Sequence, residues 1–308
     1  MSKPVLCAGR FYCDLVFADA PRLPTFGTEV FAPSLSLHAG GGAFITAANL
    51  AALGHRVTQF SCLPATPFDT TALTEMARHG VDATACQRAI AGVDPQITVA
   101  IASEGDRAFI TRNAGPAIPE LGSVNLADYS HLHIGELRTL QDHPGLLTAA
   151  RTAGITVSLD CAWQDEFDPD VADLIAKVDV FLPNESEAAA LSAIGIPQAC
   201  APLTVIKCGE DGSRVHDGNG WVHAAITKPV TVLDATGAGD AFNAGFLTCW
   251  LEGAPLQDCL AKGNACGAAA VQFIGGAGCL QPGLGSDLKQ AKSHHVLSSG
   301  SSGRSTRH

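Results

Sequence analysis

The stretch "VTVLDATGAGDAFNAGFLTCWLEG" (residues 230–253) joins an apolar run, a glycine-rich turn and a second, longer apolar run. Residues 230–235 have the composition of a buried strand, whereas Phe242, Phe246 and Trp250 recur at the spacing of one face of a helix. Glycines at such a turn let the backbone approach a ligand, and the first amides of a helix attract anions. The stretch predicts a strand, a turn and a helix with an anion site at the turn.

Asp240 falls in the first turn of this predicted helix, where two roles are open. An aspartate there can cap the helix, which is the common case, or it can take a proton from a substrate hydroxyl. The amides of Gly237, Ala238, Gly239 and Asp240 are expected to be unpaired at the helix start. The turn holds no lysine, so it is not a Walker-type loop. The first predicted strand is not followed by GxGxxG, which disfavours a Rossmann-type dehydrogenase.

Apolar runs alternate with helical patterns along the chain, which predicts a mostly parallel sheet covered by helices, an α/β fold. Predicted strands span residues 4–9, 56–63, 131–135, 155–160, 178–184, 203–209 and 230–235, and predicted helices include 41–54 and 69–80. Residues 12–38 and 95–113 break this rhythm, and the second reads as a hairpin turning at Glu104–Gly105. Two outcomes are open for these segments: they pair into a small β lid over the sheet, or they form separate surface hairpins.

The bulk composition is that of a globular enzyme acting on small molecules. The 308 residues are 46% hydrophobic and 16% charged, with a formal net charge of -11. This charge argues against nucleic acid as a partner, because such binding needs many cationic groups. Eleven cysteines without a CxxC pair or metal-ligand spacing are predicted to be free thiols. No apolar span reaches membrane length and no secretory h-region begins the chain, so we expect no membrane partner and a cytoplasmic location.

Several motifs in the chain occur in an order that resembles one enzyme family. "DATGAGDAF" resembles the C-terminal signature DTxGAGD of the ribokinase-like (phosphofructokinase-B type) carbohydrate kinases, and "AGGGAFITAANLAALG" resembles their N-terminal signature. Further family-like pieces are "GRFYCD" (9–14), "NESE" (184–187), "IKCGEDGS" (206–213) and "KGNACGAAAV" (262–271). The resemblance covers about residues 4–285.

The resemblance implies a three-layer α/β/α ribokinase-like fold with a mostly parallel central sheet and a small β lid. The kinase domain would span 1–289, with lid insertions at about 12–38 and 95–113, and the Ser/Gly/His-rich residues 290–308 are expected to be a disordered tail. The implied activity is ATP-dependent phosphorylation of a hydroxymethyl group of a sugar or sugar derivative. A nucleoside kinase is the alternative; a non-catalytic sugar sensor is disfavoured because Asp240 and its glycines are intact. Some members of the family dimerise through the lid, so the resemblance also allows a homodimer of this chain.

The family motifs also imply roles for individual residues. Asp240 would be the general base, and the amides of Gly237 to Asp240 would hold the transferring group. The residues expected to bind the acceptor are Asp14, Gly41, Gly42, Thr46, Asn113, Glu136 and Arg138. Those expected around ATP are Asn184, Lys207, Gly209, Gly212 and Asn264. Glu187 would orient hydrated Mg²⁺, and Asp234 with Thr236 would bind a monovalent cation such as K⁺.

Plainer roles stay open for five of these residues. Asn184 and Glu187 have the spacing of a helix capping box. Lys207 can be a solvated lysine at a strand end, Asn264 a helix-surface amide, and Arg138 a partner in an internal salt bridge.

Two segments depart from the family pattern. The position of the usual sugar-binding asparagine in GGxxxN is held by Ile45 or, with a shift of one residue, by Thr46. Residues 61–70, "SCLPATPFDT", replace a turn rich in glycine and aspartate. We therefore expect an acceptor that is not bound as ribokinase binds ribose.

Overall fold

The computed structural model describes residues 3–90, 92–93, 96–103, 106–226, 230–273 and 277. The predicted turn at Glu104–Gly105 and the predicted tail 290–308 lie outside these residues. Within the described part, no helix is long and apolar enough to span a membrane. The ten cysteines of that part are all free, in agreement with the prediction.

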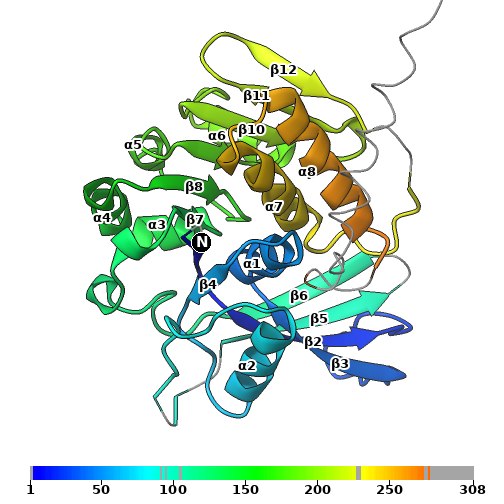
Figure 1. The fold of residues 1–308 in the computed structure, drawn as a ribbon. Helices are drawn as coiled ribbons and strands as arrows, with labels where there is room; N and C mark the ends of the chain where they lie inside the picture. Colours follow the sequence, from blue (N-terminus) through cyan, green and yellow to red (C-terminus); the bar gives the residue numbers. More distant parts are fainter. Residues whose placement is uncertain are drawn as a thin grey trace, which may run out of the picture.

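A large sheet forms the centre of the fold (Figure 1). Its eight strands have the order β12-β11-β10-β9-β8-β7-β1-β4. They span Val5–Ala8 (β1), Val57–Phe60 (β4), His131–Ile134 (β7), Thr156–Asp160 (β8), Val180–Leu182 (β9), Leu203–Lys207 (β10), Ser213–His216 (β11) and Trp221–Ala224 (β12). Strands β4, β1, β7, β8, β9 and β10 are parallel, whereas β11 and β12 extend one edge as an antiparallel hairpin.

Helices cover both faces of this sheet (Figure 1). They span Gly42–Ala52 (α1), Phe68–Arg78 (α2), Leu137–Asp142 (α3), Gly145–Ala153 (α4), Val171–Ile175 (α5), Glu185–Ala193 (α6), Ala238–Leu251 (α7) and Leu256–Ala270 (α8). Because side chains alternate along a strand, Val5 and Cys7 join one core with α1, α7 and α8, while Leu6 and Ala8 join another with α3 to α6. The predicted three-layer α/β/α arrangement is confirmed.

The two segments that break the strand-helix rhythm form a second sheet. Strands Tyr12–Ala18 (β2), Ser34–Gly40 (β3), Ile97–Ser103 (β5) and Asp106–Arg112 (β6) have the order β3-β2-β5-β6. The parallel pairing of β2 with β5 joins the two insertions, so they are not separate hairpins. This small sheet projects beside α1 and α2 at the lower right of Figure 1.

The predicted strand at residues 230–235 is wrong. No strand occupies this run, in which Val232 and Leu233 are 61% and 66% exposed; instead the amides of Leu233 and Asp234 donate to the carbonyl of Val271. The edge of the sheet next to β10 is taken by the β11–β12 hairpin, which we did not predict because its strands are short and partly polar. Apolar composition alone therefore misplaced one element.

Candidate active site

A cavity of about 410 Å³ opens at the carboxyl ends of the parallel strands. Strand β1 lies between β7 and β4, so the strand order reverses there, which is where ligands bind in open α/β sheets. The cavity brings together seven of the predicted site residues: Gly42, Asn184, Glu187, Lys207, Gly209, Gly239 and Asp240. These residues come from distant parts of the chain.

A second cavity of about 620 Å³ adjoins the first and shares Lys207, Gly209 and Gly239 with it. Its wall is mostly apolar, with Phe242 and Val271 among the lining side chains, and it includes the predicted residues Gly212, Ala238 and Asn264. Asn264 is buried and donates from Nδ2 to the carbonyl of Ala224 at 2.8 Å, so it is not a helix-surface amide. Apolar walls with a few fixed polar groups suit an aromatic base.

The glycine-rich turn starts helix α7 as predicted. Gly237 is the N-cap residue in a left-handed conformation (φ 74°), and no side chain caps the helix. Asp240 therefore does not have the capping role; its Oδ1 accepts a hydrogen bond of 3.4 Å from the Thr46 hydroxyl on α1. A Cβ atom on Gly42 would lie 3.0 Å from the same oxygen, so this position leaves room for the carboxylate. Asp240 faces the cavity, and among the amides beside it that of Ala238 is not unpaired as expected but donates to the carbonyl of Ala235 at 3.3 Å.

The environment of Asp240 raises the pKa of its carboxyl well above the usual range. Burial is the main cause, and the negative charge of Asp160 adds to it, while Lys207 and the Thr46 hydroxyl act in the opposite direction. A carboxyl with a raised pKa is a stronger base once it is ionised. This setting suits a group that takes a proton from a hydroxyl.

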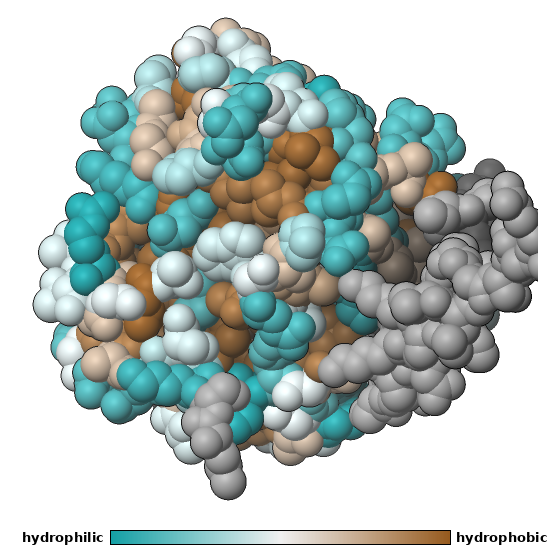
Figure 2. All heavy atoms as spheres, turned by 45° about the horizontal axis from the view of Figure 1, so that its top comes forward, coloured by the Kyte–Doolittle hydropathy of each residue, from teal (hydrophilic) through white to brown (hydrophobic). Residues whose placement is uncertain are grey.

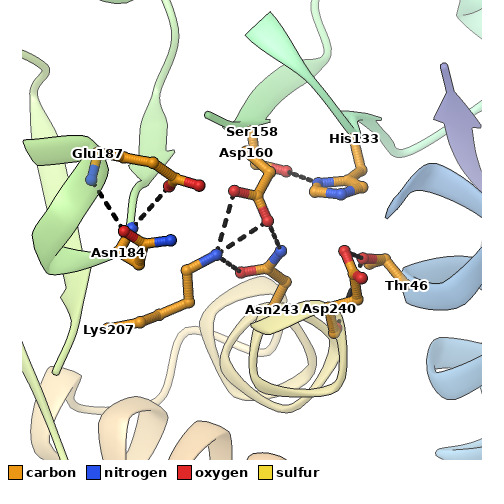
Figure 3. Close-up of polar contacts among 9 residues, drawn as sticks. All are labelled: Thr46, His133, Ser158, Asp160, Asn184, Glu187, Lys207, Asp240 and Asn243. Carbon is orange, nitrogen blue, oxygen red and sulfur yellow. Dashed lines mark hydrogen bonds and ion pairs between the residues drawn. The ribbon is translucent and has the colours of Figure 1, made fainter. Parts of the chain in front are cut away.

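Lys207 lies at the junction of the two cavities, and it is not a solvated lysine. Its side chain is only 12% exposed and forms an ion pair with Asp160 at 2.9 Å (Figure 3). Burial lowers the pKa of Lys207, but the charges of Asp160 and Glu187 more than offset this, so the pKa is raised and the group is cationic. A Cβ on Gly239 would lie 3.4 Å from Nζ, which places the ammonium beside the first turn of α7.

Asn184 and Glu187 form a complete capping box at the start of α6. The amide of Asn184 donates to Glu187 Oε2, and the amide of Glu187 donates to Asn184 Oδ1, both at 2.8 Å. Both residues also line the first cavity, so the capping role does not exclude contact with a ligand. Burial and Asp160 raise the pKa of Glu187. With Asp160, Glu187 offers the carboxylate oxygens that suit hydrated Mg²⁺.

Asp14 lies on β2 of the small sheet, close to Gly40. A Cβ on Gly40 would come within 2.1 Å of Asp14 Oδ2, so this glycine makes room for the carboxylate. Burial raises the pKa of Asp14 to about 6, although a hydrogen bond from Thr98 opposes the shift. Gly41 has φ 101° and packs against the carbonyl of Arg10.

The other residues predicted to bind the acceptor have partners within the protein. Arg138 is 66% exposed and forms a salt bridge with Asp142 at 3.0 Å, which is the plainer role left open for it by the sequence. Glu136 is half-buried and accepts from the Arg10 amide and the Thr139 hydroxyl. The Tyr12 hydroxyl donates to Asn113 at 2.5 Å.

Ile45 and Thr46, the two residues that can occupy the position of the usual sugar-binding asparagine, are both buried. Thr46 is fully buried, and its hydroxyl contacts the Asp240 carboxylate and carbonyl rather than the cavity. Ile45 is 6% exposed. Of the two residues that can occupy the position of the usual asparagine, Thr46 therefore holds the Asp240 carboxylate and does not line the cavity.

Asp234 and Thr236, the predicted cation ligands, lie just before α7. Asp234 is buried, and its Oδ1 accepts from the Thr236 amide at 2.8 Å. This bond shapes the turn that leads into α7.

Sequence reasoning missed four polar residues around the site: Asp160, Asn243, His133 and Ser158 (Figure 3). Asp160 ends β8, and an acid at the carboxyl end of a buried parallel strand could have been noticed. Asn243 lies three residues after Asp240, on the same side of α7. His133 contacts the Ser158 hydroxyl through Nδ1 at 2.9 Å, and burial lowers its pKa to about 4, so the ring is neutral.

The chain matches one protein family over most of its length and resembles several characterised kinases. Residues 3–282 match the family described as "pfkB family carbohydrate kinase". The ATP-dependent ribose-1-phosphate kinase of Halopiger xanaduensis is 28% identical over 86% of this chain and 90% of that protein. The fructoselysine 6-kinase of Shigella flexneri is 41% identical, over 30% of this chain and 35% of that protein.

Solved structures show the same fold at low sequence identity. Arabidopsis thaliana ribokinase complexed with ribose and ATP has a TM-score of 0.75 and 20% identity, and covers 91% of this chain and 96% of its own. Fructokinase with bound ATP from Xylella fastidiosa has a TM-score of 0.78 and 20% identity, with 95% and 100% covered. The nucleoside kinase of Methanocaldococcus jannaschii has a TM-score of 0.74 and 20% identity, with 91% and 96% covered.

Proposed function

The chain belongs to the pfkB family of carbohydrate kinases, and from that premise we propose that it transfers the γ-phosphoryl group of ATP to a hydroxymethyl group of a sugar or sugar derivative. The observation that carries this proposal is the shared cavity of Asp240, Lys207 and the start of α7, next to a second cavity that suits a nucleobase. The kinase domain is assigned to residues 1–289. We place the enzyme in the cytoplasm, where ATP is abundant.

The nucleotide would lie with its base in the apolar cavity and its phosphates at the junction with the first. Asn264, Gly209 and Gly212 line this apolar cavity and would contact the base and the ribose. The amides of Gly237 to Asp240 and the ammonium of Lys207 would receive the γ-phosphoryl oxygens, since a helix start and a buried cation both stabilise anions. The transition state spreads charge over these oxygens, so fixed donors contribute strongly.

Asp240 would accept the proton of the acceptor hydroxyl as the oxygen attacks phosphorus. Thr46 orients the carboxylate from α1, and the capping box fixes Glu187. The donor set of Asp160, Asn184 and Glu187 fits Mg²⁺ that enters with the nucleotide, and the ion would neutralise phosphate charge there. Asp234 and the Thr236 carbonyl would hold a monovalent cation such as K⁺ behind the anion site.

The acceptor screen tests this proposal directly. ADP release would be measured with a panel of ketoses, aldoses, sugar acids, phosphorylated sugars and nucleosides. We expect turnover with at least one carbohydrate and weak turnover with nucleosides. Turnover confined to nucleosides would reassign the enzyme as a nucleoside kinase, and ADP release independent of every acceptor would contradict phosphoryl transfer to a hydroxyl.

Asp14 would bind the acceptor, because an ionised carboxylate accepts two hydroxyl hydrogen bonds in a fixed geometry. Its pKa of about 6 means that the ionised form is present above this pH and is lost as pH falls below it. We expect the KM for the acceptor to rise below pH 6, while the KM for ATP stays constant. In Asp14→Asn, the acceptor KM should be raised about 10-fold or more, and this pH dependence should disappear. An unchanged acceptor KM would remove Asp14 from the site.

The outer face of the small sheet would join two copies of the chain into a homodimer. Pairing of Leu15 with Leu37 and Val99, and of Val99 with Ile110, places these four side chains on one face. Leu37 is 47% exposed and Ile110 is 72% exposed, whereas Asp14 lies on the opposite face. In the view of Figure 2 the protein surface is mostly hydrophilic with separate hydrophobic patches. A large exposed apolar patch commonly marks an interface.

Ile110→Asp tests the dimer, because a buried unpaired charge would disrupt such an interface. Light scattering should show a dimer for the unmodified protein and a monomer for this variant. Thr152→Asp, at an exposed position of α4 far from the small sheet, adds the same charge and should stay dimeric. A monomeric unmodified protein, or a dimeric Ile110→Asp variant, would contradict the proposed interface.

A further inference from the structure

A buried amide connects the base-bearing helix to the lysine at the phosphate position. Asn243 is 0% exposed and lies one turn after Asp240 on α7. Its Nδ2 donates to Asp160 Oδ2 on β8, and its Oδ1 accepts from Lys207 Nζ on β10 at 3.4 Å (Figure 3). One side chain thus joins three elements that each supply a group to the cavity.

The surroundings of Asn243 indicate that the amide is there for these contacts. The neighbouring α7 residues Phe242, Ala244, Phe246 and Leu247 are apolar and buried. A buried amide destabilises a fold unless its donor and its acceptor are both paired, and an apolar residue would fill the same space at lower cost. Both ends of the Asn243 amide have a partner, and both partners are charged.

The lengths of the Lys207 contacts show which one can be exchanged. Its ammonium reaches Asp160 at 2.9 and 3.1 Å and Asn243 at 3.4 Å. An ammonium has three N–H donors, and the two Asp160 oxygens belong to one carboxylate, so they lie in nearly the same direction from Nζ and one donor serves both. The contact with Asn243 is the longest and joins a cation to a neutral acceptor, which makes it the weakest. A phosphate oxygen at the start of α7 would take the remaining N–H or replace Asn243, and would leave the contact with Asp160 in place.

We infer that Asn243 is a positioning residue that keeps Lys207 beside the first turn of α7 and fixes α7 against Asp160. When a phosphate oxygen binds to the ammonium, the ion pair with Asp160 is kept, and the bond from Asn243 to Asp160 keeps α7 in place. Asp240 lies on the adjoining turn, so its direction toward the acceptor hydroxyl depends on the same contacts. This inference rests on the proposed phosphoryl transfer and adds Asn243 and Asp160 to its machinery.

Asn243→Leu removes both hydrogen bonds and keeps a similar volume. With ATP and the best acceptor of the screen, we expect kcat to fall about 10-fold, because a small misplacement of reacting groups slows the chemical step. The two KM values should change less than about two-fold, since no ligand contacts Asn243 in this scheme. Thr248→Val, which removes a hydroxyl farther along α7, is the matched control and should keep normal kcat. If Asn243→Leu does not fold, Asn243→Ser replaces it.

A double-mutant cycle with Lys207→Met separates positioning from a general structural effect. Because Asn243 acts partly through Lys207 and partly through its bond to Asp160, adding Asn243→Leu to Lys207→Met should lower kcat further, but by clearly less than the about 10-fold loss of the single variant. If the losses of kcat in the two single variants simply multiply in the double variant, Asn243 does not act through Lys207 and the inference is overturned. An unchanged kcat in a folded Asn243→Leu variant would overturn it as well. A normal kcat in Lys207→Met alone would instead contradict the phosphate role of Lys207, so the two failures are distinguishable.

Discussion

Asp240→Asn is expected to lower kcat by about 10² to 10⁴, the usual contribution of a general base. The asparagine side chain has nearly the same shape and can still accept the hydrogen bond from Thr46. It cannot take a proton from the acceptor hydroxyl, so the loss should fall on the chemical step. Binding of ATP should stay near normal because the amides of the α7 start are unchanged.

Steady-state rates and nucleotide binding should therefore be measured on the same preparation of this variant. Thr248→Val on the same helix is the control for nonspecific effects on α7. A kcat within about two-fold of the unmodified enzyme would exclude Asp240 as the base. If the affinity for ATP fell by as large a factor as kcat, the substitution would instead disrupt the proposed anion site.

Lys207→Met is expected to lower kcat by about 10² to 10³, the range seen when one preorganised transition-state donor is removed. The ammonium lies beside Gly239 at the junction of the cavities, so its charge should act on the transferring group. ATP should also bind more weakly, because a buried cation is lost from a site that holds several carboxylates.

The substitution also leaves Asp160 without its ionic partner, so stability has to be measured with activity. Breaking such a pair can destabilise a fold by about 3–5 kcal/mol. Lys207→Gln, which keeps a donor near Asp160, is the second variant, and Lys177→Met at an exposed position is the control. A folded Lys207→Met enzyme with normal kcat would exclude transition-state stabilisation by this lysine.

The fold and the acidic and glycine residues of the site were largely predictable from local patterns. The turn at 234–240 is specific because an apolar run followed by closely spaced glycines, an acid and the start of a helix has few uses. The small sheet could be identified as segments outside the strand-helix rhythm, but its pairing could not be derived from the residues alone. That pairing depends on contacts such as Cys13 with Ile97, far apart in the chain.

The missed residues share a physical reason. Asn243 meets Asp160 across 83 residues of sequence, and Lys207 meets Asp160 across 47. Neither side chain shows its partner in its local sequence, so Lys207 could be read as solvated and Asp160 as the end of a strand. The strand predicted at residues 230–235 was wrong for the opposite reason. Its local pattern suited a strand, but β11 takes the place beside β10 in the sheet.

Phosphorus NMR of the reaction with ATP and the best carbohydrate of the screen tests the central claim most directly. We predict that the γ-phosphate signal is replaced by a phosphomonoester on a hydroxymethyl carbon of the carbohydrate, one for each ADP formed. The Asp240→Asn enzyme should bind ATP and yield this product at least about 10² times more slowly. Release of inorganic phosphate in place of the ester, or an equally fast reaction with Asp240→Asn, would contradict the proposed kinase mechanism.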